Sequence, residues 1–243
     1  MENNNKALVV ITGASSGIGE ATARLFSENG HPLLLLARRV EKMEAMNLPN
    51  TMCRKVDVVE IEQIRAAVKE AEAVYGATEC IINNAGMMLL GDVAVQNPQE
   101  WKTMLDVNVL GVLNGMQVVL SDMKARRGGT IINVSSVAGR KTYGDHAAYC
   151  ATKFGVHAMT ERAREEAALS DVRMVTIAPG AVETELLGHT TDDDMVKDYE
   201  DWKQEIGGVL RSVDIANAIW YAFNQPQGVN VREIVIAATR QEP

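Results

Sequence analysis

The chain has 243 residues, of which 47% are hydrophobic and 23% charged, enough for one large α/β domain or two small ones. Its formal net charge of -8, without an apparent basic patch, argues against nucleic acid as a partner. Three scattered cysteines lack metal-ligand spacing and indicate reduced thiols. Neither a signal peptide nor a bilayer-length apolar run is apparent, so we expect a soluble cytoplasmic protein with no membrane partner and no metal site.

Short apolar runs alternate with segments of helical period along the chain. Strands are predicted at residues 7–13, 32–38, 51–58, 78–86, 129–136, 172–180 and 232–239. Helices are predicted at residues 17–30, 41–46, 61–76, 98–129 and 147–169. Continuous apolar runs are typical of strands buried on both faces, and regular strand–helix alternation favours a parallel sheet covered on both sides. The sequence therefore predicts one α/β domain over residues 1–243 with a seven-stranded parallel sheet.

The acidic segment 185–210 interrupts this alternation after the strand predicted at 172–180. Its position next to a strand end favours an inserted substrate lid or a capping pair of helices. The three consecutive aspartates at 192–194 are interpreted as part of a solvated loop and not as a metal cluster.

The first strand leads into the sequence TGASSGIG, which runs from Thr12 to Gly19. Glycines at a strand-to-helix turn let the backbone approach a pyrophosphate, and the helix N-terminus offers free N–H groups. The spacing G-x-x-x-G-x-G differs from the usual G-x-G-x-x-G fingerprint, and a tight turn requiring glycine is the alternative. Because the motif lies between an apolar strand and an amphipathic helix, phosphate binding is favoured.

The end of the second predicted strand carries Arg38 and Arg39. An acidic residue about 20 positions beyond the glycine motif would bind the ribose hydroxyls of NAD. A guanidinium group instead attracts a 2′-phosphate, which a carboxylate would repel. Two surface arginines after a strand are the alternative, and their position favours NADP as the cofactor.

Tyr149 and Lys153 lie four residues apart, which places both side chains on one face of a helix. A half-buried tyrosine followed by a solvated lysine is the simplest explanation of this pair alone. A tyrosine with an ordinary pKa of about 10 needs a lower one to act as an acid or base near neutral pH. A neighbouring ammonium group favours the phenolate, so the pair suits acid–base catalysis if other motifs support it.

Further motifs follow in a fixed order: Asp57-Val58, NNAG at 83–86, Asn108, INVSSVAG at 132–139, and PGAVET at 179–184. Together with TGASSGIG and the Tyr149–Lys153 pair, they resemble the short-chain dehydrogenase/reductase family along nearly the whole chain. The resemblance implies a Rossmann-like, doubly wound single domain and nicotinamide-dependent carbonyl or alcohol chemistry on a small molecule. It also implies a homo-oligomer, commonly a tetramer.

The resemblance assigns residues to a cofactor site and to a catalytic site. The residues expected to hold NADP are Gly13, Ser15, Ser16, Gly17, Ile18, Gly19, Arg38, Arg39, Asp57, Val58, Asn84, Ala85, Gly86, Tyr149, Lys153, Pro179, Gly180, Val182 and Thr184. The residues expected to be catalytic are Asn108, Ser136, Tyr149 and Lys153. Ser136 is preferred to Ser135 because the family's serine lies thirteen residues before the tyrosine, and because neighbouring strand residues point to opposite sides.

The resemblance implies a role for each catalytic residue. Tyr149 exchanges a proton with the substrate oxygen, while Lys153 lowers the pKa of Tyr149 and bonds the cofactor ribose. Ser136 orients the substrate oxygen. Asn108 holds a water that passes protons between Lys153 and solvent. Cys150 is interpreted as a small packing residue.

The C-terminal sequence QPQGVNVREIVIAATRQEP lacks the glycine-rich tail of many 3-oxoacyl reductases. With the arginines after the second strand, it resembles NADP-dependent 3-hydroxy acid dehydrogenases, some acting on serine, whose relatives include broad ketone and aldehyde reductases. Arg140, Lys141 or His146 could bind a substrate carboxylate, or they could be solvated loop residues. Met87 to Leu89, Leu186, Leu187 and Trp202 could form a substrate wall, or belong to the core or a subunit interface.

Three functions therefore compete. The first is an NADP-dependent oxidoreductase acting on a small 3-hydroxy acid or related carbonyl compound. The second is a reductase of bulky ketones, aldehydes or acyl-carrier-linked substrates, although the chain lacks an obvious basic surface for an acidic carrier. The third is a non-catalytic dinucleotide sensor, which is disfavoured because all four expected catalytic residues are present.

Overall fold

A computed structural model describes residues 6–242 of the chain. Its main sheet has seven strands, and every neighbouring pair is parallel. The strands are β1 (Leu8–Thr12), β2 (Leu33–Ala37), β3 (Thr51–Lys55), β4 (Thr78–Asn83), β5 (Thr130–Val134), β6 (Arg173–Pro179) and β9 (Glu233–Ile236). Their spatial order is β3-β2-β1-β4-β5-β6-β9. The predicted seven-stranded parallel sheet is confirmed.

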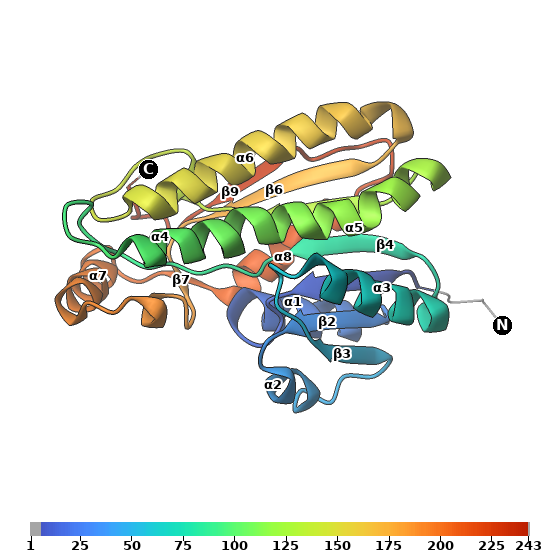
Figure 1. Cartoon of the computed structure of the whole chain (residues 1–243), viewed down its shortest axis with the longest axis horizontal. Coiled ribbons are helices and arrows are strands. Elements are labelled where there is room, and N and C mark those ends of the chain that lie inside the picture. Colours follow the sequence, from blue (N-terminus) through green and yellow to red (C-terminus); the bar gives the residue numbers. More distant parts are fainter. Residues whose placement is uncertain (1–5, 243) are drawn as a thin grey trace.

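Helices cover both faces of the sheet, as Figure 1 shows. The helices are α1 (Gly17–Glu28), α2 (Val40–Glu44), α3 (Ile61–Tyr75), α4 (Pro98–Leu105), α5 (Gly111–Arg126), α6 (Ala147–Ala167), α7 (Asp193–Glu205) and α8 (Ser212–Phe223). Buried residues of α3, α5 and α6 form one core layer, and those of α1 and α8 belong to the other. The chain is therefore a single doubly wound, Rossmann-like domain.

Strand β1 explains why the predicted strands are apolar without alternation. Leu8 and Val10 belong to the core beneath α3 and α5, whereas Val9 and Ile11 belong to the core beneath α1 and α8. All four side chains have no exposed surface. Because successive side chains of a strand point to opposite faces, a sheet covered on both sides requires apolar residues at every position.

The helix predicted at 98–129 is not a continuous α-helix. It consists of α4, a π-helical turn at Asp106–Leu110, and α5. The stretch Pro98–Arg126 is long and apolar enough to cross a membrane, but Val112, Met116 and Val119 are buried in the core that includes residues of α3 and β4. Packing in this core thus accounts for the apolar character of the stretch.

Helix α8 and a small parallel pair, β7 (Val182–Glu183) with β8 (Leu210–Arg211), were not among the predicted elements. Ile215, Ala216 and Ile219 on α8 are buried in the core that also contains Phe26 of α1. The side chain of Asp214 accepts a hydrogen bond from the Arg211 N–H and caps the helix start. This acidic residue followed by apolar residues at helical spacing was the signal that could have predicted α8.

The segment 185–210 contains one α-helix and not a pair. A short 3₁₀ turn at Leu187–His189 precedes α7, and Asp192 caps α7 by accepting hydrogen bonds from the N–H groups of Asp194 and Met195. Figure 1 shows α7 beside β7 at one end of the sheet, away from the helices that cover its faces. Its role as a substrate lid stays a prediction.

Candidate active site

A cavity of about 600 Å³ lies at the carboxyl ends of the sheet strands. Ligands of doubly wound folds bind at this edge, where the strand order changes direction next to β1. Among the predicted site residues, the cavity walls contain Gly13, Ser15, Ser16, Gly17, Ile18, Arg38, Arg39, Asp57, Val58, Asn84, Ala85, Gly86, Ser136, Tyr149, Lys153, Pro179, Gly180, Val182 and Thr184. Gly19 and Asn108 are the two predicted residues that do not line it.

The glycine-rich turn forms one end of the cavity. Gly13 and Gly17 have φ values of 65° and 56°, in the left-handed region that favours glycine. A Cβ atom on Gly13 would lie 2.7 Å from the Cα of Ala85, so the turn is pressed against the end of β4. Helix α1 begins at Gly17, and its first N–H groups lack partners within the helix, which suits a phosphate.

Gly19 packs against the glycine-rich turn and does not line the cavity. It lies outside the cavity wall, and a Cβ atom there would come within 2.3 Å of the Gly13 carbonyl oxygen and 2.6 Å of the Asn84 side-chain nitrogen. Gly19 therefore lets α1 pack directly on the turn, and its contact with a cofactor stays a prediction. The sequence motif could not distinguish this packing role from direct contact.

The side chains of Arg38 and Arg39 lie beside the glycine-rich turn, and Lys42 follows them in α2. The Arg39 guanidinium donates to the hydroxyl oxygens of Ser15 and Ser16 at 3.2 and 2.9 Å. Among residues 6–242, Arg38 makes no hydrogen bond or ion pair and its side chain is exposed. This donor set fits a dinucleotide that carries an additional phosphate on its ribose.

Tyr149 and Lys153 are brought together on α6 in a buried environment. Tyr149 is 5% exposed and Lys153 is 6% exposed. The Lys153 ammonium lies 5.7 Å from the centre of the Tyr149 ring and donates a hydrogen bond to the Val134 carbonyl at 3.1 Å. Burial lowers the pKa of Lys153 to about 8. Burial also raises the pKa of Tyr149, while its hydrogen bond with Ser136 opposes that rise.

The two adjacent serines point to different partners. The Ser136 hydroxyl accepts a hydrogen bond from the Ala138 N–H at 3.1 Å and interacts with Tyr149. The Ser135 hydroxyl instead lies 3.1 Å from the Lys153 carbonyl oxygen and 2.9 Å from His157 Nδ1. Ser136 is therefore the serine whose hydroxyl accompanies Tyr149, in the arrangement expected for orienting a substrate oxygen.

Asn108 lies behind the cavity wall in the π-helical turn. Its side-chain oxygen accepts from the Met87 N–H at 2.8 Å, and its amide donates to the Met87 carbonyl and the Thr152 hydroxyl at 2.9 and 3.1 Å. A Cβ atom on Gly86 would lie 3.4 Å from the Asn108 oxygen and 3.7 Å from the Lys153 ammonium. Asn108 thus holds the backbone of Met87, in the loop after β4, in place near Lys153. The role of Asn108 in binding a water stays a prediction.

A family model for short chain dehydrogenases matches residues 7–195. The matched range includes the glycine-rich turn, Ser136, Tyr149 and Lys153. The chain belongs to the short-chain dehydrogenase family. An uncharacterized oxidoreductase of Staphylococcus saprophyticus is 39% identical over 247 residues, which cover 99% of each chain.

Two solved structures show how closely this dehydrogenase follows the family fold. A closed form of serine dehydrogenase complexed with NADP+ is 28% identical, with a TM-score of 0.88 over 97% of this chain and 96% of the other. An alcohol dehydrogenase from the archaeon Thermococcus sibiricus, complexed with 5-hydroxy-NADP, is 26% identical, with a TM-score of 0.85 over 98% and 99% of the two chains.

Aromatic side chains surround the part of the dehydrogenase cavity next to Tyr149. Tyr143, His146, Tyr199 and Trp202 line it. The Tyr199 ring lies 5.2 Å from the Trp202 ring and 6.2 Å from the His146 ring, measured between centres. Tyr199 and Tyr143 were not predicted as site residues. The three-residue spacing of Tyr199 and Trp202 on an otherwise acidic helix was the available signal.

The candidate cations for a substrate carboxylate occupy different environments. Arg140 forms an ion pair with Glu233 at 2.8 Å and does not line the cavity. His146 lines it, but burial lowers the pKa of His146 and so favours the neutral ring. Lys203 on α7 also lines the cavity and forms ion pairs with Glu183 and Glu200 at 3.0 and 2.8 Å.

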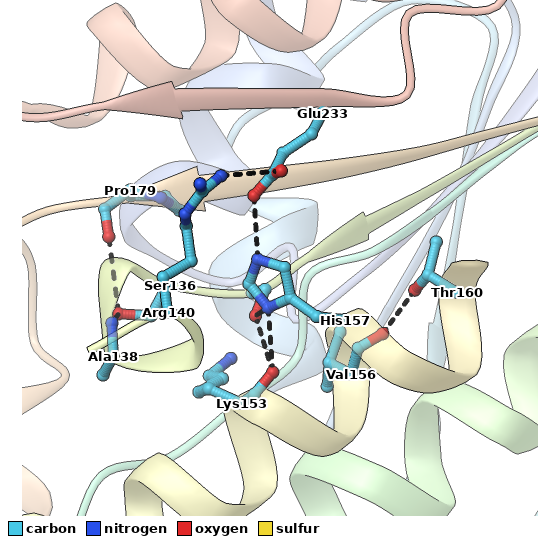
Figure 2. A network of polar contacts seen from close by, with 10 residues as sticks. Ser136, Ala138, Arg140, Lys153, Val156, His157, Thr160, Pro179 and Glu233 are labelled. Atoms are coloured by element: carbon cyan, nitrogen blue, oxygen red, sulfur yellow. Dashed lines mark hydrogen bonds and ion pairs between the residues drawn. The ribbon is translucent and has the colours of Figure 1, made fainter. Parts of the chain in front are cut away.

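A partly buried polar network supports the α6 turn that carries Lys153. Figure 2 shows His157 between the Lys153 carbonyl and the Glu233 carboxylate of β9, with Arg140 on the other carboxylate oxygen. When the His157 Nε2–H is donated to Glu233 at 3.0 Å, the Nδ1 atom can accept the Ser135 hydroxyl hydrogen. The network joins α6 to the loop after β5 and to the sheet edge.

Replacing His157 with alanine is expected to lower the free energy of unfolding by about 1–3 kcal/mol, because it removes the hydrogen bonds that His157 makes with Glu233 and with the buried Ser135 hydroxyl. Urea denaturation measures this change. The matched control is Arg162→Ala on the same helix, which removes exposed ion pairs with Glu165 and Glu166 and should cost less than about 1 kcal/mol. Equal losses in the two variants would contradict a bracing role for His157.

Proposed function

We propose that this chain is an NADP-dependent oxidoreductase that transfers a hydride between the nicotinamide and a small hydroxy or keto substrate. The observation that carries the proposal is the convergence of two sites on one cavity. The phosphate-binding turn with Arg38 and Arg39 forms one part, and Ser136, Tyr149 and Lys153 form another. A non-catalytic sensor would not need this buried catalytic set.

The chemistry of the residues at the predicted cofactor site supports a dinucleotide as the ligand. The N–H groups at the start of α1 would bind the pyrophosphate, and the guanidinium groups of Arg38 and Arg39 would bind the 2′-phosphate. Asp57 and Val58 would flank the adenine, while Pro179, Val182 and Thr184 would contact the nicotinamide end. The bound nicotinamide supplies or accepts the hydride. Both solved relatives described above contain NADP or a modified NADP, which supports this cofactor.

The protein residues handle the proton. Tyr149 would donate its hydroxyl proton to the substrate oxygen during carbonyl reduction and would accept it during alcohol oxidation. Ser136 would hydrogen-bond the same oxygen and fix its position. Lys153 in its charged form would favour the phenolate of Tyr149, opposing the effect of burial. Asn108 would complete the path by holding the water that exchanges protons with Lys153.

A 3-hydroxy acid, with serine among the candidates, is the proposed substrate class. The similarity to serine dehydrogenase supports it. A broad ketone, aldehyde or 3-oxoacyl reductase is the alternative, and a specific observation favours it. The cavity next to Tyr149 is lined by aromatic rings, and Lys203, the cavity lysine on α7, is already paired with two glutamates. Such walls suit an uncharged substrate.

We also propose a cytoplasmic homotetramer. Large apolar side chains on neighbouring helices are exposed, namely Leu105, Leu110, Leu113 and Phe154, which are between 42% and 49% exposed. Exposed apolar side chains on neighbouring helices suit contact with another subunit.

The function is tested by initial rates with 3-hydroxypropionate, serine, simple ketones, aldehydes and an acetoacetyl thioester, each with NADP(H) and NAD(H). We expect NADP(H) to be preferred by at least about tenfold, because charged hydrogen bonds to the 2′-phosphate are strong. Oxidation of 3-hydroxypropionate or serine would support the hydroxy acid assignment. Turnover restricted to ketones, aldehydes or the thioester would establish the alternative. Tight NADPH binding without any turnover would contradict an enzymatic function.

A further inference from the structure

Glu185 forms ion pairs with Arg39, which the proposed function assigns to the 2′-phosphate, and with the nearby Lys42. One carboxylate oxygen lies 2.7 Å from Arg39 Nη1, and the other lies 2.9 Å from Lys42 Nζ. These two contacts hold the pKa of Glu185 at about 2, so the carboxylate is charged throughout the physiological range. The pairs join residues 143 and 146 positions apart in the chain, so the fold and not local sequence creates them.

The position of Glu185 places it inside the cofactor site. It lines the same cavity as Gly13, Arg38 and Arg39, and it directly follows Thr184, whose side chain approaches the position of a Cβ atom on Gly17 to 3.1 Å. The same Arg39 guanidinium that pairs with Glu185 also bonds Ser15 and Ser16 of the turn. Glu185 is therefore a carboxylate bound to a guanidinium of the phosphate-binding end of the cavity.

The charge arrangement makes Glu185 and a phosphate mutually exclusive at these groups. Arg39 directs Nη1 to the carboxylate and Nη2 to the two serine hydroxyls. Lys42 directs its ammonium to the other carboxylate oxygen. A phosphate that binds Arg39 and Lys42 must displace an anion already bound there, whereas Arg38 has no such partner among residues 6–242. Two anions at one cation pair repel each other.

We propose that Glu185 is a cofactor-selectivity residue that competes with the 2′-phosphate of NADP(H) for Arg39 and Lys42. The proposal rests on the proposed function, because it takes the nicotinamide dinucleotide as the ligand. NADP(H) binding then requires Glu185 to leave these cations, whereas NAD(H), which lacks the 2′-phosphate, leaves the ion pairs intact. Glu185 thereby weakens NADP(H) binding and links the start of the segment 185–210 to the type of cofactor bound.

The test is direct binding of NADPH and NADH to the purified protein by isothermal titration calorimetry, with Glu185→Gln as the variant. We expect the NADPH dissociation constant to fall roughly tenfold, because the substitution removes a charge that both occupies the cations and repels the phosphate. The NADH dissociation constant should change less than about twofold. In about 0.5 M salt the gain for NADPH should shrink, since screening weakens exposed charge interactions.

Two controls separate competition from a general change in charge. Glu183→Gln removes the same charge two residues earlier in the chain, but the partner of Glu183 is Lys203, so NADPH affinity should stay within about twofold. In an Arg39→Ala/Lys42→Ala background, Glu185→Gln should no longer improve NADPH binding, because the contested cations are gone.

Weaker NADPH binding by Glu185→Gln, or equal changes for NADPH and NADH, would overturn the proposal while leaving the proposed function intact. The first result would mean that Glu185 orients Arg39 for the phosphate. The second would mean that Glu185 acts on the segment as a whole. Failure of both wild type and variant to bind NADPH would overturn the proposed function, and the selectivity role of Glu185 with it.

Discussion

Replacing Tyr149 with phenylalanine is expected to lower the turnover number about a thousandfold, because general acid–base catalysis by a positioned side chain contributes about 10²- to 10⁴-fold. The substitution removes the hydroxyl that interacts with Ser136 and keeps the ring, which is buried against Met88, Leu89 and other residues of the same cluster. NADPH affinity should change less than about threefold, since only one hydrogen-bonding group is lost. Steady-state rates and calorimetric NADPH titration measure the two quantities separately.

Tyr221→Phe is the matched control for this result. Tyr221 lies on α8, is 58% exposed and does not line the cavity, so the loss of its hydroxyl should leave turnover unchanged. If Tyr149→Phe retained more than about a tenth of the wild-type turnover, Tyr149 would not be the general acid. A parallel loss of NADPH binding would instead indicate that the hydroxyl supports the cofactor site.

Replacing Lys153 with methionine is expected to abolish most activity and yet make the protein without cofactor more stable at pH 7. Burial lowers the pKa of Lys153 from its ordinary 10.5 to about 8, so the folded state holds the charged form at a cost. The difference between these values corresponds to about 3 kcal/mol at about 1.4 kcal/mol per pH unit. Losing the hydrogen bond to the Val134 carbonyl offsets about 1 kcal/mol. A net gain of about 2 kcal/mol remains.

The direction of the pH dependence follows from proton binding. Below about pH 8 the lysine is protonated in both the folded and the unfolded state, and the full cost of burying the charge is present. Between about pH 8 and 10.5 the folded state binds fewer protons, so wild-type stability rises with pH relative to the methionine variant. Above pH 10.5 the lysine is neutral in both states, and the variant should be less stable by about 1 kcal/mol.

Urea denaturation of both proteins at pH 7 and at pH 10.5 measures this reversal. Lys69→Met on α3 is the control, because Lys69 is exposed. The difference in unfolding free energy between this variant and wild type should be the same at both pH values. A variant that is less stable than wild type at pH 7 would contradict a buried, destabilising charge at Lys153. Activity lost without a stability gain would then assign Lys153 a structural role as well.

The sequence predicted the sheet well because the responsible physical signal is local. The run LVVIT at 8–12 has an apolar residue at each of its first four positions, and burial on both faces of a sheet is the simplest explanation of that pattern. Helix α8 was missed although Asp214 and the apolar residues after it form a helix-start signal. The π-helical turn at Asp106–Leu110 could not be predicted from a local motif. Its Asn108 contacts Met87 in the loop after β4, which is distant in the sequence.

The candidate site was predicted residue by residue from motifs, and most of those residues meet at one cavity. Gly19 and Asn108 are the exceptions, because a motif identifies a required residue without saying whether it faces the ligand or supports a neighbour. Glu185, Tyr199 and His157 were not predicted as site residues. Glu185 pairs with Arg39 and Lys42, and His157 pairs with Glu233, so both depend on residues far away in the chain, which no short-range pattern records. For Tyr199, the spacing to Trp202 on the same helix was a local signal.

The sequence by itself determined the seven strands of the main sheet, the glycine-rich turn, and the four-residue spacing that places Tyr149 and Lys153 on one helix face. Those features depend on residues close together in the chain. Only the tertiary structure decided that Lys153 is buried with a pKa of about 8, and that Glu185 sits on Arg39 and Lys42. Solvent exposure and electrostatic partners depend on which distant segments fold against a side chain, so a local pattern cannot specify them.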